Sequence, residues 1–171
     1  ESGCEYERTV DVDGSGVMET ALTVCTDALV AHSDVNIIFG INNDSSFGGY
    51  EAAKAAGFDE DKLLVCSMGF EGDRAIDELL KGGAYKFDVA FFPNYFGKIA
   101  MYSLVALGLG VIGQNEDGTP YDVWAPGTVI DKESFYNYYY EEDGEWKEKT
   151  ESIDELAVRL GLDPRILNLE K

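Results

Sequence analysis

Basic side chains are scarce in this sequence. Its 171 residues include 13 Lys and Arg against 33 Asp and Glu, which gives a formal net charge of −20. Phosphate backbones and anionic membrane surfaces repel a chain of this charge, so no nucleic-acid partner is expected. The acidity itself is most simply explained as a means of keeping the surface soluble.

Histidine and cysteine are also rare. The single histidine, His32, excludes a zinc site built on imidazoles and a Ser-His-Asp triad within one chain. The three cysteines have no paired-ligand spacing: Cys25 falls on the apolar face of an expected helix, Cys66 falls within an expected strand, and Cys4 lies near the N-terminus. We therefore expect no metal, no cofactor and no catalytic residue.

Uninterrupted apolar runs are missing as well. The longest, around residues 99–112, is broken by Tyr102, Ser103 and glycines, which argues against a membrane span. The N-terminal residues show no signal peptide. From this we expect either a cytosolic chain or one whose targeting segment has been removed.

The sequence does contain a regular alternation of strand-like runs and segments of helical periodicity. Strands are expected at residues 8–13, 35–41, 62–68 and 87–92, and a helix follows each of them. Ser15 is the expected N-cap of the first helix, and Ser45 or Ser46 that of the second. Four successive strand–helix units predict an α/β fold with a doubly wound parallel sheet flanked by helices.

The alternation ends after Gly113. Residues 114–120 are expected to form a polar turn and residues 121–130 one or two short strands. A short helix is expected at 132–140, with its aromatic side chains in a stripe packed against the sheet, and a solvated acidic loop at 141–145. The spacing of Ser152 and Glu155 is that of a capping box, which predicts a last helix.

Polar turns follow three of the expected strands. They lie at residues 42–46, 69–72 and 91–94, each between an apolar run and a helical segment. The carboxyl ends of parallel strands share one rim of the sheet, and open sheets bind small ligands at that rim. The sequence therefore indicates ligand binding rather than catalysis.

Residues 34–97 resemble a known pattern when the turns are placed in this way. The pieces that carry the resemblance are residues 35–44, Gly48, 52–57, 65–72, 75–76, 81–82, Pro93 and Gly97, and 128–132 resemble a last strand. In order and spacing they are similar to the C-terminal portion of type I periplasmic binding proteins, the ribose- and galactose-binding class that serves ABC transporters. The similarity covers roughly residues 6–140, and Glu71 occupies the acidic position of the family's G-x-D-G turn.

The resemblance implies a fold and a division of the chain. Residues 1–92 would form the ligand-binding lobe of a type I periplasmic-binding-protein-like fold. Residues 93–127 would belong to the other lobe, and residues 128–171 would form the return strand and a C-terminal helical extension. It also implies a sugar-like ligand, an ABC permease as partner and an extracytoplasmic location, in the periplasm or anchored on the cell surface.

The resemblance also implies ligand-binding residues. Asn42 matches the family's ligand-binding asparagine and Glu71 its ligand-binding aspartate, although Glu71 is one methylene longer. Sugar hydroxyls donate and accept hydrogen bonds, as an Asn amide does, and a carboxylate accepts strongly. Phe91 stands where the family often has a polar residue and is expected to contact an apolar ring face. Asp13 from the first turn and Asn94 are further candidates.

Length is the largest departure from the family. The chain is too short for two lobes, so a missing N-terminal lobe or a second chain is expected to complete the fold, or two copies to pair through an exposed sheet edge. The effector-binding domain of a LacI-type transcription regulator is the alternative function, because it shares the fold; the acidic charge favours transport. An enzyme is not expected, since Asp44 and Glu71 would need the defined separation of a glycosidase pair.

Overall fold

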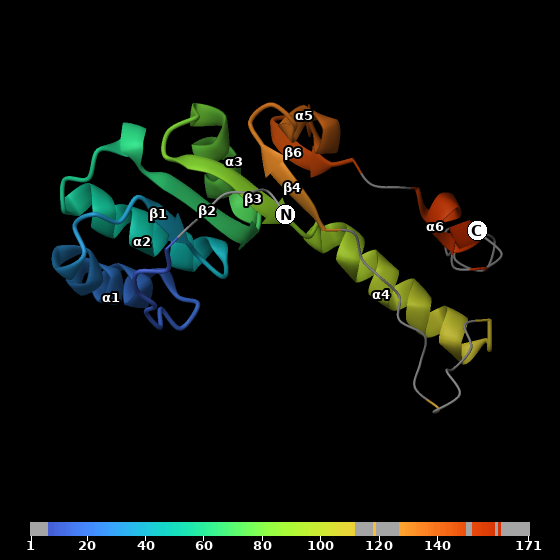
Figure 1. Cartoon of the computed structure of the whole chain (residues 1–171). Coiled ribbons are helices and arrows are strands. Elements are labelled where there is room, and N and C mark those ends of the chain that lie inside the picture. Colours follow the sequence, from blue (N-terminus) through green and yellow to red (C-terminus); the bar gives the residue numbers. More distant parts are fainter. Residues whose placement is uncertain (1–6, 112–117, 119–126, 150–151, 160, 162–171) are drawn as a thin grey trace. The chain divides into compact units, whose positions relative to one another are not determined.

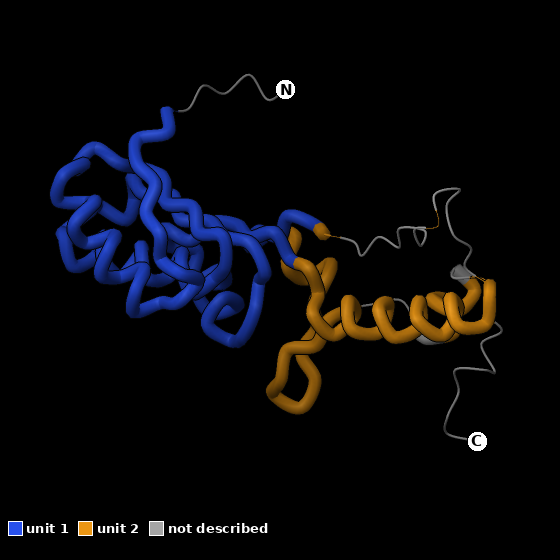
Figure 2. Tube along the Cα trace, turned by 90° about the horizontal axis from the view of Figure 1, so that it is seen from below, with its two compact units in different colours: residues 1–90, 128–133 blue, residues 91–127, 134–171 orange. Residues whose placement is uncertain are grey.

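The computed structural model describes residues 7–111, 118, 127–149, 152–159 and 161. The chain divides into two compact units, the first comprising residues 1–90 and 128–133 and the second residues 91–127 and 134–171 (Figure 2). The predicted turn at 114–120, the predicted strand residues 121–126 and Cys4 lie outside the described residues, apart from Gly118.

The first unit is built on a four-stranded sheet in the order β1-β2-β3-β4 (Figure 1). Its strands are β1 (Ile37–Phe39), β2 (Leu64–Gly69), β3 (Tyr85–Ala90) and β4 (Thr128–Asp131). The first three run parallel, and β4 is antiparallel to β3. Parallel neighbours need crossover connections, which contain α2 (Asn43–Ala55), the short 3-10 helix η1 (Glu60–Lys62) and α3 (Gly72–Lys81). The predicted α/β fold with a parallel sheet flanked by helices is confirmed.

Helix α1 (Met18–Ala31) precedes the sheet and packs closely against α2. The close approach depends on Gly48 in α2, because a Cβ atom there would lie 2.6 Å from both the Ala21 Cβ and the Met18 carbonyl oxygen. A second close approach, at Gly40, joins β1 to the first turn of α2, where a Cβ would meet the Ser46 nitrogen at 2.3 Å. These two glycines therefore allow α1, β1 and the first turn of α2 to pack closely, next to the rim at which the sequence predicts a ligand.

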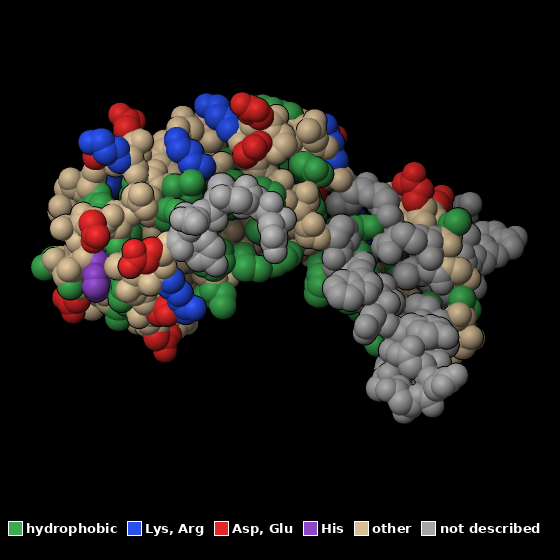
Figure 3. Space-filling view, in the orientation of Figure 1, with side chains coloured by type: hydrophobic (Ala, Val, Ile, Leu, Met, Phe, Trp, Pro, Cys, Tyr) green, Lys and Arg blue, Asp and Glu red, His purple; other side chains and the backbone are tan. Residues whose placement is uncertain are grey.

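Apolar side chains line both faces of the sheet. On the face toward the helices, the apolar side chains of Val65 and Ile130 are fully buried, together with the polar side chains of Ser67 and Asp88. On the opposite face, Ile37, Phe39 and Val129 are 51%, 60% and 57% exposed. Strand register places further apolar residues between these three, and we call the whole set the apolar sheet face: Ile37, Phe39, Leu64, Cys66, Met68, Phe87, Val89 and Val129. Figure 3 shows hydrophobic side chains on the surface among scattered charged ones.

The predicted strand at 8–13 is wrong. The described residues 7–13 have no regular secondary structure, and Val10 and Val12 are exposed. A strand needs a hydrogen-bonded neighbour as well as alternating side chains, and β1 is an edge strand within the described sheet. The predicted N-cap Ser15 is also wrong. Ser15 lies in a turn with a φ angle of 54°, and the N-cap of α1 is Val17, two residues later.

The second unit begins with α4 (Pro93–Gly108), whose first residue is the expected Pro93. After the return to β4 come α5 (Phe135–Tyr138), β5 (Tyr139–Glu142), β6 (Glu145–Glu148) and α6 (Ile153–Arg159). The predicted capping box is confirmed, since Ser152 and Glu155 exchange hydrogen bonds at 2.8 and 3.2 Å. Among the described helices none is both long and apolar enough to cross a membrane.

The predicted helix at 132–140 is confirmed only at residues 135–138, and the predicted acidic loop at 141–145 is wrong. The helix is limited to four residues, and the loop is an antiparallel hairpin turning at Asp143 and Gly144, with φ angles of 56° and 80°. Asp-Gly favours two-residue hairpin turns with positive φ. The aromatic run packs around Trp146 instead of forming a helical stripe: the Phe135 ring lies 4.9 Å from Trp146 and 5.1 Å from Tyr139 between ring centroids.

Candidate functional site

The carboxyl ends of β1 and β2 are followed directly by the N-termini of α2 and α3. The turn between β2 and α3 is tight, with positive φ angles at Gly69, Phe70 and Gly72 of 117°, 55° and 78°. Phe70 is the unusual member, because a residue with a Cβ rarely adopts this conformation. Such strained turns are common at binding sites, where surrounding contacts hold them in place.

Asn42 ties this rim to the loop before α1. Its side chain accepts a hydrogen bond from the Ser45 amide at 2.9 Å and donates one to the Gly16 carbonyl at 3.0 Å. Asn42 is therefore the N-cap of α2, and the predicted caps Ser45 and Ser46 are wrong. Asp13 lies at the start of the same loop, exposed, and its carboxylate accepts from the Ser15 amide at 2.8 Å.

Asn43 links three segments of the rim from within the core and is 7% exposed. Its amide nitrogen donates to the Asp88 carboxylate at 2.6 Å and to the Tyr85 hydroxyl at 2.9 Å, and its carbonyl accepts from the Glu71 amide at 2.8 Å. The sequence pattern selects Asn42 and does not single out Asn43. Asn43 is the next residue and the first position of α2, and no local pattern distinguishes two adjacent asparagines.

Asp88 is a fully buried carboxyl group on β3. It accepts hydrogen bonds from Asn43 and from the Tyr85 hydroxyl. Burial raises the pKa of Asp88, although these two hydrogen bonds and the amides of Val89 and Phe70 act in the opposite direction. Those amides favour the ionised form, yet no hydrogen bond of good geometry reaches the second oxygen, Oδ1. Burial, followed by the charge of Asp88, also raises the pKa of Tyr85 far above its usual value.

Glu71 presents its carboxylate at the surface. It occupies the N-cap position of α3, but its side chain makes no capping hydrogen bond and the residue is exposed. Its main chain is fixed through Asn43, and its side chain lies beside Gly69. The structure thus brings Asn42, Asp13 and Glu71 to the rim of the first unit, where hydrogen-bonding groups are available and no basic side chain is among them.

Phe91 and Asn94 belong to the second unit. Phe91 follows β3 directly and is 40% exposed, and Asn94 is an exposed residue in the first turn of α4. The backbone amides of Asn94 and Tyr95 face the carboxylate of Glu148 and lower its pKa, against the larger effect of burial, which raises that pKa. A helix N-terminus stabilises a carboxylate in this way. The N-terminus of α4 is therefore already paired with Glu148 of the same unit.

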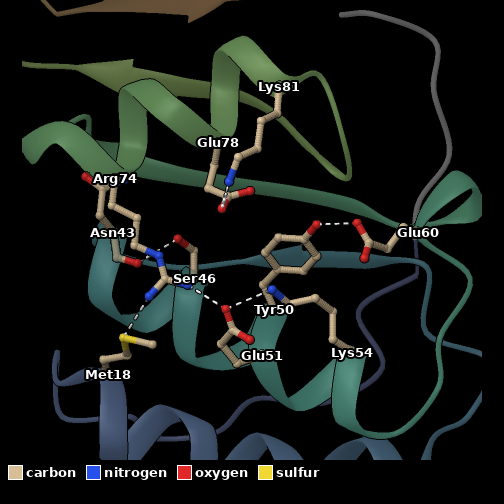
Figure 4. Close-up of polar contacts among 10 residues, drawn as sticks. All are labelled: Met18, Asn43, Ser46, Tyr50, Glu51, Lys54, Glu60, Arg74, Glu78 and Lys81. Carbon is tan, nitrogen blue, oxygen red and sulfur yellow. Dashed lines mark hydrogen bonds and ion pairs between the residues drawn. The ribbon is translucent and has the colours of Figure 1, made fainter.

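Arg74 joins the three helices of the first unit (Figure 4). From α3 its guanidinium reaches Glu51 of α2 at 2.6 Å and the Met18 sulfur of α1 at 3.2 Å, and it lies 4.5 Å from the centroid of the Phe47 ring. Lys54 pairs with the same carboxylate at 2.8 Å and is the main reason that the pKa of Glu51 is lowered. Both cations pair with the one carboxylate of Glu51, so the cluster holds the three α-helices together.

Metal binding finds no support in the described part of the chain, where no group of three or more His, Cys, Asp or Glu residues could hold an ion. Cys25 is half-buried in α1 and Cys66 is buried in β2, and burial raises the pKa of both thiols. Neither thiol is therefore activated as a nucleophile.

Among the solved structures with this architecture are solute-binding proteins of ABC transporters. One from Actinobacillus succinogenes, with bound D-allose, is 26% identical, with a TM-score of 0.59 over 73% of this chain and 41% of its own. One from Agrobacterium vitis, with bound D-fucose, is 23% identical, with a TM-score of 0.57 over 73% and 40%. A periplasmic ribose ABC transporter from Conexibacter woesei is 23% identical, with a TM-score of 0.55 over 71% and 38%. No protein-family model and no curated protein matches the chain.

The chain has the fold of type I periplasmic binding proteins, and the predicted resemblance to part of a sugar-binding member of this class is confirmed. It spans 38–41% of the length of the three proteins described. The first two are solute-binding proteins, the third is a periplasmic ribose ABC transporter, and none of the three is described as an enzyme.

Proposed function

Starting from this fold, we propose that the chain is part of the solute-binding component of a bacterial ABC importer and binds a sugar-like molecule at the rim of its first unit. The observation that carries the proposal is the placement of Asn42, Asp13 and Glu71 at the carboxyl ends of β1 and β2 or in the loop hydrogen-bonded there. The protein with bound D-allose, at 26% identity, supports a carbohydrate as the ligand class.

The chemistry of the rim favours a neutral polyol. The Glu71 carboxylate accepts hydrogen bonds from hydroxyl groups, and charge-assisted bonds of this kind are stronger than neutral ones. An anionic sugar would meet carboxylates here and a net charge of −20 on the whole chain. Phe91 and Asn94, which belong to the second unit, stay proposed ligand-binding residues of that unit, one for an apolar contact and the other for a side-chain amide.

The remaining partners are part of this proposal. The chain spans about two fifths of the length of the matching proteins, so a second lobe or a second chain is proposed to enclose the ligand from the other side. A second copy paired through the exposed edge of β1 is the alternative way of covering the sheet. An ABC permease is the proposed partner of the protein. The proposed location is therefore outside the cytoplasmic membrane, in the periplasm or anchored to the cell surface.

The alternative functions have less support. A LacI-type effector domain shares the fold, but the solved structures described above are transport proteins. A glycosidase would require Asp44 and Glu71 to act as an acid pair. Asp44 lies exposed in the first turn of α2, where the helix dipole stabilises its negative charge, so the residue has a structural explanation. We propose binding without catalysis.

The test is a titration followed by NMR, which detects weak binding by a single lobe. The full chain, labelled with nitrogen-15, is titrated with D-allose, D-fucose, D-ribose and, as an anionic probe, glucose 6-phosphate. We expect at least one neutral sugar to shift the amide signals of residues 13–16, 42–45 and 69–72, and the phosphate ester to shift none. If no neutral sugar moves these signals at millimolar concentration, the carbohydrate assignment is wrong.

Glu71→Gln tests the contribution of the carboxylate. Loss of its charge is expected to weaken sugar binding by about 1–2 kcal/mol, the difference between a charge-assisted and a neutral hydrogen bond. Asp73→Asn is the matched control, because Asp73 is an exposed carboxylate in the first turn of the same helix. Equal affinities of the Glu71 and Asp73 variants would remove Glu71 from the site.

A further inference from the structure

Asn43 is buried, yet it contacts the exposed residue on which the proposed function depends. Its carbonyl oxygen accepts the Glu71 amide at 2.8 Å, from a position 28 residues earlier in the chain. Glu71 stands between Phe70 and Gly72, both with positive φ, so the chain here has few conformations available. A hydrogen bond to the middle of such a turn fixes the direction in which the Glu71 side chain leaves the backbone.

The orientation of the Asn43 amide is dictated by β3. The Tyr85 hydroxyl donates to Asp88, so its remaining lone pairs and the Asp88 oxygen both present acceptors to Asn43. The Asn43 nitrogen must therefore face β3 and its oxygen must face Glu71. The reversed amide would place a carbonyl against a carboxylate and an amino group against the Glu71 amide, which leaves buried polar atoms unpaired.

We infer that Asn43 is a positioning residue, oriented by Tyr85 and Asp88, that sets the conformation of the 69–72 turn and thereby aims the Glu71 carboxylate at the ligand. This inference rests on the proposed function for its last clause. Its first part concerns the turn alone and is measurable without any sugar. Tyr85 and Asp88 are both buried, so neither meets a ligand directly. Tyr85 acts on the turn through Asn43, whereas Asp88 acts through Asn43 and also through the Phe70 amide.

The variants that test this role are Tyr85→Phe, which removes one acceptor of Asn43 and keeps the ring, and Asp88→Leu, which removes the other acceptor of Asn43 together with the acceptor of the Phe70 amide. Ser67→Ala is the matched control. Ser67 is fully buried, pairs with Asp88 in the strand register and faces the same side, but its hydroxyl contacts only the carbonyl of Met68, at 3.4 Å, and has no connection to Glu71.

The readout is hydrogen exchange of the Glu71 amide, compared with core amides of β2 in the same sample. Asp88→Leu is expected to accelerate exchange at Glu71 about tenfold relative to those core amides, the factor that corresponds to one lost buried hydrogen bond. Tyr85→Phe is expected to give a smaller acceleration and Ser67→Ala none. A purely structural role would change all amides together, in step with global stability, and that result would overturn the inference.

Sugar affinity is measured for the same variants with whichever probe sugar shifts the wild-type signals most. Weaker binding in the order Asp88→Leu, Tyr85→Phe, Ser67→Ala supports aiming of Glu71. Unchanged affinity in Asp88→Leu despite faster Glu71 exchange overturns it. If no sugar binds the wild type, the proposed function and the aiming of Glu71 at a sugar both fail, while the exchange data alone decide whether Asn43 sets the turn.

Discussion

Asp88 is a carboxyl group inside the protein whose hydrogen-bond partners, Tyr85 and Asn43, are both neutral. Burial raises the pKa of Asp88, so the folded protein holds this proton more tightly than the unfolded chain does. The stabilisation from this group is therefore fully present below the unfolded pKa and is lost as pH rises through the folded pKa.

Comparison with Asp88→Asn isolates this effect, because the other carboxylates titrate in both proteins. We expect the free energy of unfolding of the wild type, relative to the variant, to be most favourable near about pH 4 and to fall toward neutral pH, by at most about 1.4 kcal/mol per pH unit. Urea unfolding across this range measures the difference. Parallel curves for the two proteins would show that the carboxyl group has an ordinary pKa.

Asn42 has a capping role that can be separated from ligand binding. Asn42→Ala removes both of its hydrogen bonds and is expected to lower the free energy of unfolding by about 1–2 kcal/mol, as for other N-caps. Asn42→Asp keeps an acceptor for the Ser45 amide and loses only the donor to Gly16, so it is expected to lose less than half as much. Urea unfolding measures the free energy of unfolding of both variants. Equal losses would mean that the hydrogen bond to Gly16, rather than the cap on Ser45, stabilises the protein.

The candidate site was readable from the sequence only in part. Polar turns after apolar runs located the rim and pointed to Asn42 and Glu71. The role of Asn43 depends on Tyr85 and Asp88, which lie 42 and 45 residues downstream. The register between β2 and β3 contains an irregularity at Val65 and Cys66, and no local pattern specifies which β3 side chains then reach α2.

At the scale of elements, the contact between α1 and α2 is set by a missing side chain. Alanine usually stabilises a helix relative to glycine by about 1 kcal/mol. At Gly48 the added Cβ would lie 2.6 Å from the Ala21 Cβ and the Met18 carbonyl, so we expect Gly48→Ala to destabilise the α1–α2 pair instead. Amide hydrogen exchange across α1 and α2 would detect this as faster opening of both helices.

Gly97→Ala is the corresponding control in α4. Apart from its chain neighbours and its own helix backbone, no atom of the described residues lies within 4 Å of the position that its Cβ would occupy, so ordinary helix propensity is expected to prevail. Exchange in α4 should then slow, by a factor corresponding to at most about 1 kcal/mol. Slower exchange around Gly48→Ala as well would contradict the close packing of α1 on α2.

Elements were predictable where local signals agreed with one another. The helices after β1, β2 and β3 and the capping box of α6 were located from periodicity and stop signals. The Asp143-Gly144 hairpin was missed although its turn signal is strong, because the aromatic run before it also matches helical spacing. The strand at 8–13 was predicted from alternation, which carries no information about whether a neighbouring strand exists.

On the scale of the whole molecule, two forces oppose each other at the sheet. The apolar sheet face and the open edge of β1 favour association, whereas a net charge of −20 keeps copies apart. We expect the chain to be monomeric at low ionic strength and to associate as salt screens the charge, since the screening length falls to about 10 Å at 0.1 M. Sedimentation velocity over a salt series measures this.

Phe39→Lys is expected to abolish the salt-induced association, because it places a charge on the edge strand of that face. Val30→Lys changes the net charge equally at a position on α1 that is 75% exposed and is not part of the apolar sheet face, so it should leave association unchanged. Loss of association in both variants would assign the effect to net charge rather than to the sheet.

The bond from Asn43 to the Glu71 turn has a practical meaning for anyone who redesigns this protein. A loop copied from residues 69–72 into another scaffold would arrive without the amide that holds it and without the strand residues that hold the amide. Transplanting the specificity of this rim requires moving three separate stretches of chain together, and a library that randomises the loop alone searches among conformations that the parent protein does not permit.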